Sequence, residues 1–224
     1  MYLEQNLKGL CQQHKMDYEA LVDDLEIDDI EEISLQDLEI LCEEYQIDLY
    51  ALLFKPLFLD KNIRQKLAKI KLLVLDVDGV MTDGGMYFTE KGDHIKKYNA
   101  KDGMAIQTLV KRGFQTAIIS AGYMQEVVQV RARLLGIQHC HVTQEPKLEV
   151  LKRICGDLGI ALDEVALIGD DINDLEMMQN IGFSACPADA VNQIKFQSDI
   201  VLSKKGGEAC VREFVDTYLM KAIG

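Results

Sequence analysis

Two groups of acidic residues stand at positions where carboxylates would repel one another. Asp76 and Asp78 directly follow the apolar run LLVL, residues 72–75. The second group, Asp170, Asp171 and Asp174, lies within the segment GDDIND. Carboxylates gathered at one place resist ionisation unless a cation offsets their charge. Because a small set of oxygen ligands suits Mg²⁺, which also binds substrate phosphates, the two groups predict a magnesium site that handles a phosphate.

Two further residues fit the same chemistry. Ser120 offers a hydroxyl donor and Lys147 a mobile positive charge, and both suit the oxygens of a phosphate group. A carboxylate nucleophile, a second carboxylate for proton transfer, a metal and a lysine together describe phosphoryl transfer through an aspartyl-phosphate. The residue types therefore predict an enzyme that acts on a phosphate ester.

The elements that would position these residues begin at residue 71. Apolar, strand-like runs alternate there with helical stretches of about ten residues. The strand-like runs are 71–76, 114–120, 139–143, 164–169, 182–187 and 199–203. The helical stretches lie near 102–112, 124–135, 147–158, 172–180, 188–195 and 207–220. This alternation predicts an α/β fold, a Rossmann-like parallel sheet with helices on both faces.

The reactive residues fall where the strands of such a sheet end. In open parallel sheets, ligands bind beyond the carboxyl ends of the strands. Asp76 closes the first run, Ser120 the second, and Asp170 follows the fourth. We therefore expect these side chains to converge. The segment GGMYFTEKGDHIKKYN, residues 84–99, interrupts the alternation and predicts a β-hairpin insertion, with Asp83 as the turn residue that opens it.

The N-terminal part of the chain has a different character. Residues 1–60 hold 16 Asp and Glu against 3 Lys and Arg, whereas residues 61–224 hold 21 of each. Short amphipathic segments, with Ser34 and Asp48 as expected caps, predict a small all-α domain. We expect an acidic helical module at 1–60, a linking helix at 61–70 and the α/β domain at 71–224. The charge argues against nucleic-acid binding, which depends on Lys and Arg, and favours interaction or oligomerisation.

Bulk properties limit the class of protein further. The 224 residues include no apolar run of the roughly 20 that span a bilayer. The N-terminus MYLEQNLKGL lacks the pattern of a signal peptide. Six scattered cysteines form no CxxC pair, which fits reduced thiols better than a disulfide framework. We expect a cytoplasmic protein that binds neither membrane nor nucleic acid.

The motif DVDGVMTDG (76–84), Ser120, Lys147 and GDDIND, in this order, resemble the four motifs of the haloacid dehalogenase superfamily. The resemblance covers residues 71–220. It implies that Asp76 is the nucleophile that becomes phosphorylated. It implies that Asp78 protonates the leaving oxygen and then activates the water that hydrolyses the intermediate.

The same resemblance assigns the metal and phosphate ligands. Mg²⁺ would bind the Asp76 carboxylate, the Asp78 carbonyl and Asp170. Asp171 and Asp174 would hold the waters of the metal or orient Lys147. The groups expected on the transferring phosphoryl group are Ser120, Ala121 and Lys147.

The spacing of the motifs leaves no room for the cap domain that many members carry. This matches a capless sugar-acid phosphatase branch that acts on 3-deoxy-manno-octulosonate 8-phosphate (KDO 8-phosphate) or 2-keto-3-deoxy-nononate 9-phosphate. The resemblance implies a homotetramer in which a neighbouring subunit closes the site over a small sugar-acid phosphate. Lys204 and Lys205, in the segment KKGGEACVREFV (204–215), are the expected contacts to the anionic sugar.

The second motif departs from that branch. Octulosonate phosphatases usually carry TGR there and nononate phosphatases TGE, but this chain carries SAGY, residues 120–123. Gly122 lacks the side chain that would help to select the sugar, and Tyr123 is its possible substitute. The implied reaction type is unaffected, whereas the identity of the sugar stays open.

Two functions of other classes stay open. A receiver-like signalling domain also phosphorylates an aspartate after a strand, but it needs a long-lived acyl phosphate, and Asp78 would speed its hydrolysis. The chain could also be a regulatory or scaffold protein that acts on a partner of a sugar-nucleotide pathway through its N-terminal helical module.

Overall fold

The structure is a computed structural model that describes residues 2–54, 56–90, 92–122 and 125–223. Its contacts divide the chain into two compact units, Met1–Lys61 and Asn62–Gly224. Helix α5, Lys61–Leu67, forms where we expected the linking helix, and it lies almost wholly in the second unit. None of the helices in the described ranges has the length and apolar character that crossing a bilayer demands.

In the described residues of the first unit, four short α-helices and a 3₁₀ turn, Ile30–Glu32, surround an apolar core. The helices are α1 (Leu3–His14), α2 (Tyr18–Asp24), α3 (Leu35–Tyr45) and α4 (Leu49–Phe54). The core consists of Leu3, Leu7, Leu38, Leu41 and Leu52. The two predicted caps are confirmed: Ser34 Oγ accepts from the Asp37 N–H at 3.1 Å, and Asp48 Oδ1 from the Ala51 N–H at 2.9 Å.

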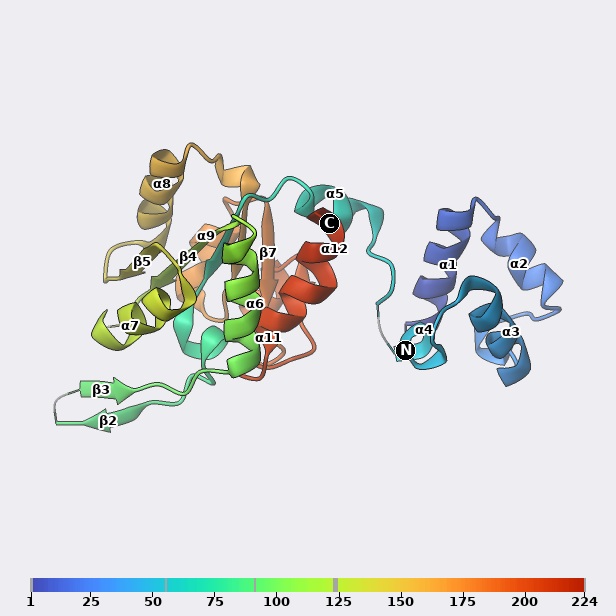
Figure 1. Cartoon of the computed structure of the whole chain (residues 1–224), viewed down its shortest axis with the longest axis horizontal. Helices are drawn as coiled ribbons and strands as arrows, with labels where there is room; N and C mark the ends of the chain where they lie inside the picture. The colour runs from blue at the N-terminus through green and yellow to red at the C-terminus, as the bar shows by residue number, and fades with distance from the viewer. Residues whose placement is uncertain (1, 55, 91, 123–124, 224) are drawn as a thin grey trace. The chain divides into compact units, whose positions relative to one another are not determined.

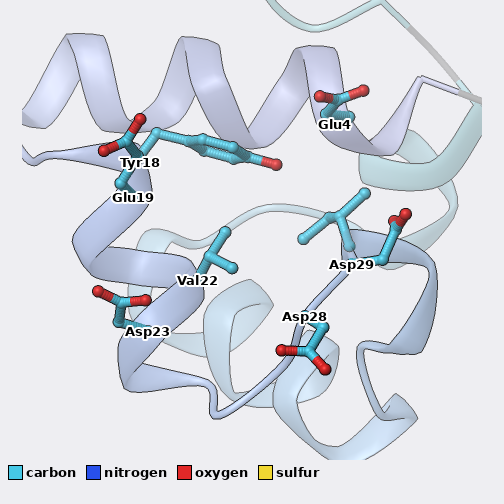
Figure 2. Close-up of a pocket in the computed structure, with 8 residues that line it drawn as sticks. Glu4, Tyr18, Glu19, Val22, Asp23, Asp28 and Asp29 are labelled. Atoms are coloured by element: carbon cyan, nitrogen blue, oxygen red, sulfur yellow. The ribbon is translucent and has the colours of Figure 1, made fainter.

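A shallow pocket lies against α1 and α2 in this unit (Figure 2). Its volume is about 580 Å³, and its lining residues are Glu4, Tyr18, Glu19, Val22, Asp23, Asp28, Asp29 and Ile30. All five of its acidic residues are exposed. Five of the 16 acidic residues of residues 1–60 therefore surround a hollow that is also lined by Tyr18, Val22 and Ile30.

The second unit contains the predicted parallel sheet. In the part of the chain that the structure describes, six strands lie in the order β5-β4-β1-β6-β7-β8, and every neighbouring pair is parallel. They are β1 (Leu72–Leu75), β4 (Gln115–Ser120), β5 (His139–Val142), β6 (Val165–Ile168), β7 (Phe183–Cys186) and β8 (Ile200–Val201). The β1 strand is fully buried because it lies at the centre, and Leu75 pairs with Ile118 on β4 and Ile168 on β6.

Helices cover both faces of this sheet, which confirms the predicted α/β fold. Helices α8 (Lys147–Leu158), α9 (Leu175–Met178) and α10 (Asn192–Gln197) pack on the face that presents Leu72, Val74 and Ala117. The opposite face is covered by α6 (Ala100–Lys111) and a C-terminal helical segment, which lie side by side (Figure 1). That segment comprises α11 (Cys210–Glu213), a π-helical stretch (Phe214–Leu219) and α12 (Met220–Ile223). Helix α7 (Gln125–Leu135) flanks β5.

The predicted hairpin is present, and it extends away from the sheet (Figure 1). Its strands are β2 (Tyr87–Thr89) and β3 (Gly92–Ile95), which pair antiparallel. Two helices begin later than predicted. Helix α10 begins at Asn192 because the N–H of Val191 bonds to the Asp170 carbonyl at 3.0 Å, and α11 begins after Ala209, whose φ is 74°.

Candidate active site

Asp76 is held at the carboxyl end of the central strand. Its N–H donates to the carbonyl of Ile168 at 3.1 Å, so the β1–β6 ladder continues to this residue. The chain then turns sharply at Gly79, whose φ is 88°. A Cβ on Gly79 would lie 1.9 Å from Asp170 Oδ2, so only glycine allows both the turn and the approach of Asp170.

Lys147 joins two of the acidic residues in a buried ion-pair cluster. It is the first residue of α8, and its Nζ lies 2.7 Å from Asp174 Oδ1 and 3.0 Å from Asp76 Oδ1. The exposed fractions are 4% for Asp76, 5% for Lys147 and 0% for Asp174. Charges this deep are tolerated only when each has a partner, so the cluster forms a single electrostatic unit.

Burial dominates the protonation of these carboxyl groups. It raises the pKa of Asp76 to about 7, with a further increase from Asp174 and a decrease from Lys147. Burial and the neighbouring carboxylates raise the pKa of Asp170 to about 8. The pKa of Asp174 is also raised by burial. Burial alone would lower the pKa of Lys147, but the charges of Asp76 and Asp174 outweigh it and raise that pKa.

The carboxylates fit a divalent cation. Oxygens of Asp76, Asp170 and Asp174 all lie within 4.8 Å of one another. When the three carboxylates are ionised, the single ammonium of Lys147 leaves two negative charges, which one divalent cation neutralises. Among the described residues, Asp170 Oδ1 is a buried oxygen without a hydrogen-bond partner, as expected of a ligand position.

Asp171 and Asp174 are placed differently, although both belong to the GDDIND segment. Asp171 is exposed, and its Oδ1 accepts from the N–H of Ile172 at 2.7 Å, which caps the 3₁₀ turn Ile172–Asp174. That turn directs Asp174 inward, where Oδ2 accepts from the N–H of Asp170 at 3.1 Å. Asp174 thus both orients Lys147 and shapes the loop that carries Asp170.

Ser120 ends β4 beside the Asp76 strand and is 2% exposed. Its Oγ accepts from the N–H of Gly122 at 3.3 Å, so its own proton stays free for a phosphate oxygen. The carbonyl of Ala121 accepts from the side chain of Gln144. A Cβ on Gly122 would meet nothing closer than 3.6 Å, so this position has room for a side chain. Tyr123 lies outside the described residues.

Asp78 lies at the edge of the site and is paired with the hairpin. Its Oδ1 accepts from Lys96 Nζ at 2.7 Å, and its side chain is 33% exposed. Asp83, five residues on, has the turn role expected of it: Oδ1 accepts from the Gly85 N–H, and Oδ2 pairs with Lys97 at 2.8 Å. Asp76 and Asp78 are therefore only two positions apart in sequence but differ in burial and in partner.

Comparison with known proteins decides the family. The model of the haloacid dehalogenase-like hydrolases matches residues 98–182. The 3-deoxy-D-manno-octulosonate 8-phosphate phosphatase of Yersinia pestis is 36% identical over 159 residues, which cover 71% of this chain and 84% of the relative. The chain belongs to the haloacid dehalogenase-like hydrolases. Its relatives there include 3-deoxy-D-manno-octulosonate 8-phosphate phosphatases, which are sugar-acid phosphatases of the kind that its motifs resemble.

Solved structures of this family share the fold of the second unit. The crystal structure of the Yersinia pestis phosphatase aligns with a TM-score of 0.70 at 34% identity, over 74% of this chain and 88% of that one. The Moraxella catarrhalis phosphatase, solved in complex with magnesium ion, phosphate ion and KDO, aligns with a TM-score of 0.68 at 35% identity. That alignment covers 73% of this chain and 93% of the other. A haloacid dehalogenase-like unit thus accounts for most of these relatives.

The C-terminal loop of this family member lies against the turn that follows Asp76. The N–H of Gly207 donates to Val80 O at 2.9 Å, and a Cβ on Gly206 would lie 1.9 Å from Gly79 O. The main chain of Lys204 is fixed by Glu213 at 2.8 Å, while the side chains of Lys204 and Lys205 are exposed. The loop is therefore fixed on the first motif through Gly206 and Gly207, and the two lysines directly before them are exposed.

One residue of the site was missed by the sequence analysis. Lys96 contacts Asp78, yet the sequence shows only two adjacent lysines, Lys96 and Lys97, at the end of the hairpin. Alternation along an extended strand sends neighbouring side chains to opposite sides, but it does not say which side faces the site. The structure resolves this: 5% of the Lys96 side chain is exposed, against 70% for Lys97.

Proposed function

We propose that this protein hydrolyses the phosphate monoester of a 2-keto-3-deoxy sugar acid, with KDO 8-phosphate as the first candidate. The observation that carries the proposal is the cluster of buried Asp76 and Asp174 with half-buried Asp170, which follows β1 and β6 and is joined by buried Lys147 from the start of α8. Relatives at 36% identity are phosphatases of KDO 8-phosphate, which supports the sugar class.

In the first step, an oxygen of the Asp76 carboxylate attacks phosphorus and the ester P–O bond breaks. Asp78 donates its proton to the departing sugar oxygen, so the sugar leaves as an alcohol and Asp78 becomes a carboxylate. Lys147 holds Asp76 through Oδ1 at 3.0 Å and keeps its carboxylate oriented. Because Asp76 is almost fully buried, little water competes for its oxygens.

In the second step, Asp78 takes a proton from water, and the water oxygen attacks the phosphorus of the aspartyl-phosphate. The acyl P–O bond breaks, which releases phosphate and restores the Asp76 carboxylate. This return of the proton explains why a phosphatase needs an acid two residues after its nucleophile. A signalling domain would lose its phosphorylated state by the same step.

We propose Mg²⁺ as the metal, held by Asp76, Asp170 and the carbonyl of Asp78, with Asp171 and Asp174 supporting its waters. When bound, it supplies charge neutralisation for the phosphoryl group and for the carboxylates. The Moraxella relative was solved with magnesium, which supports the choice. The phosphoryl group itself would be gripped by the Ser120 hydroxyl, the main chain at Ala121 and Lys147, and the sugar by Lys204 and Lys205.

A substrate comparison tests the proposal. The purified chain should release phosphate from KDO 8-phosphate in the presence of Mg²⁺, with 2-keto-3-deoxy-nononate 9-phosphate as the competing candidate. Gly122 leaves space that both sugars could use, so the ratio of kcat/KM for the two identifies the substrate. Equal and weak turnover of both, at the level of a generic aryl phosphate, would count against a sugar-acid substrate.

We further propose a homotetramer in the cytoplasm. Met86, Tyr87 and Ile95 of the hairpin are exposed, and an isolated two-stranded hairpin is marginally stable, so a neighbouring subunit is expected to cover it. The six cysteines are free thiols, which fits a reducing compartment. Solution mass measured by light scattering tests the assembly, and a monomer at micromolar concentration would refute it.

A second candidate function concerns the N-terminal unit, which we propose binds a basic partner. Two residues that line its pocket already contact an ammonium group of the chain itself, which supports the proposal: Lys8 Nζ lies 5.0 Å from the Tyr18 ring centre and 2.6 Å from Glu4. A lysine-rich peptide should bind the full chain but not residues 62–224 alone, as measured by calorimetry. Equal binding to both, or to neither, would contradict this role.

A further inference from the structure

We propose that Lys96 is a positioning residue that fixes the Asp78 carboxylate so that one chosen oxygen transfers the proton. The inference rests on the proposed function, because it concerns the acid and base step assigned to Asp78. Lys96 comes directly after β3, and the hairpin therefore contributes to the site from outside the sheet.

Lys96 differs from its neighbour Lys97 in burial. The Lys96 side chain is 5% exposed, although lysine side chains usually keep their ammonium group in water. Lys97, the next residue, also pairs with an acid of the first motif, but its side chain is 70% exposed and its partner Asp83 is 41% exposed. Burying an ammonium group is unfavourable unless its partner is well placed, so the Lys96–Asp78 contact is the constrained one of the two.

The two carboxylate oxygens of Asp78 have different surroundings. Oδ1 accepts from Lys96 Nζ at 2.7 Å, and Thr82 Oγ1 lies 3.4 Å away. Thr82 has a single hydroxyl proton, and the Val77 carbonyl is nearer to it at 3.2 Å, so Lys96 provides the firmer bond. A Cβ on Gly122 would lie 4.0 Å from Asp78 Oδ2 and 3.6 Å from Ser120 Oγ. Oδ2 therefore faces the end of β4, where the phosphoryl group is expected.

These contacts divide the work between the two oxygens. Lys96 occupies Oδ1 and limits rotation of the carboxylate, while Oδ2 carries the proton to the departing sugar oxygen. Proton transfer requires the donor within hydrogen-bond reach of the acceptor, so a freely rotating Asp78 would deliver it less often. Without Lys96, protonation of the leaving group should suffer, whereas attack by Asp76 should not.

Leaving-group dependence tests this directly. A sugar phosphate has a poor leaving group that needs the proton, whereas 2,4-dinitrophenyl phosphate has a leaving group that departs without it. Lys96→Met should lower kcat on KDO 8-phosphate on the order of 10²-fold, the low end of what general acid catalysis contributes, with little change in KM. On 2,4-dinitrophenyl phosphate the same variant should release dinitrophenol in its first turnover within about threefold of the wild-type rate, because that step needs no proton. Later turnovers with either substrate also depend on Asp78, which activates the water that hydrolyses the aspartyl-phosphate, so the first turnover is the quantity compared.

Two further variants control the experiment. Lys96→Arg retains a donor to Oδ1 and should recover part of the lost kcat on KDO 8-phosphate. Lys97→Met removes the neighbouring, exposed pair and should leave both activities unchanged. An equal loss of the first-turnover rate on both substrates in Lys96→Met, a rise in KM alone, or an Arg variant as slow as Met would overturn the inference about Lys96. A wild-type chain that releases no phosphate from either substrate would instead refute the proposed function.

Discussion

Acidic residues gather in two regions of this molecule, and the two gatherings differ in kind. In the pocket of the N-terminal unit, five carboxylates are all exposed, so water hydrates each of them. At the edge of the sheet, Asp76 and Asp174 are almost fully buried, and burial raises the pKa of Asp76 to about 7. The number of acidic residues therefore does not identify a reactive site. Burial of a few carboxylates away from water identifies it, because buried carboxylates need a cation to stay ionised.

The largest effect that this comparison predicts is on catalysis. Asp76→Asn removes the nucleophile and should lower kcat by at least about 10³-fold, as removal of a nucleophile usually does. The measurement is phosphate release from KDO 8-phosphate with Mg²⁺ present. Asp23→Asn, the same change in the N-terminal pocket, is the matched control and should leave kcat unchanged. Comparable turnover by wild type and Asp76→Asn would show that the buried acids are no more important for catalysis than the exposed acids of the N-terminal pocket.

The next effect is on stability. Lys147→Met leaves Asp76 and Asp174 buried without their ammonium partner, which should lower the free energy of unfolding by about 3–5 kcal/mol. Urea denaturation measures the change. Lys152→Met, on the same helix α8, removes an exposed pair with Glu149 at 2.7 Å and should have little effect. If the two variants unfold at the same urea concentration, the Lys147 cluster is not the constrained unit described above.

A third effect is the pH dependence of stabilisation by metal. Folding raises the pKa of Asp76 to about 7 and of Asp170 to about 8, from a usual value of 3.8. The metal-free folded state therefore binds more protons than the unfolded chain between these values, and its stability should fall as the pH rises through this window. Mg²⁺ competes with those protons, so its stabilisation should grow over the same window.

Thermal unfolding with and without Mg²⁺ measures this coupling. The increase in Tm caused by Mg²⁺ should be larger near pH 8.5 than near pH 5.5, because protons then no longer occupy the carboxylates. Asp170→Asn should remove most of the increase. An increase in Tm that is independent of pH would show that Mg²⁺ acts elsewhere on the chain.

The smallest effect belongs to the N-terminal acids. Asp23→Asn and Asp28→Asn each remove an exposed charge from a crowded pocket, so the free energy of unfolding should change by less than about 0.5 kcal/mol. Any change should be an increase in the free energy of unfolding, because one of several neighbouring negative charges is removed. A loss of more than that in chemical denaturation would mean that these carboxylates have structural partners.

The sequence predicted the parts of the site that follow from the strands. Because the LLVL run is continuous and apolar, β1 had to be central, and residues after parallel strands meet at one edge. Asp76, Ser120 and Asp170 could therefore be placed at one edge from the strands, whereas Lys147, at the start of α8, was predicted from its residue type and from the family resemblance. The predicted α/β fold and the membership in the haloacid dehalogenase-like hydrolases are also confirmed.

What the sequence did not predict depends on tertiary contacts. Lys96 faces Asp78 only because the hairpin leaves the sheet at one particular angle, and no local pattern specifies that angle. Within GDDIND, the 3₁₀ turn points Asp174 inward and Asp171 outward, which spacing alone does not reveal. Asp102 is another such case: it lies in α6, and its Oδ1 accepts from the N–H of Arg212 at 2.7 Å, across 110 positions of sequence.

The most direct test of the central claim is to trap the phosphorylated enzyme. Wild-type protein mixed with Mg²⁺ and phosphate-labelled KDO 8-phosphate is quenched in acid after a single turnover time, and the label on the protein is counted. Transient label is expected on Asp76, and no label is expected on Asp76→Asn or on protein treated with a chelator. Label on a residue other than Asp76 would contradict the proposed aspartyl-phosphate mechanism. Phosphate release by Asp76→Asn without any labelled protein would contradict it as well.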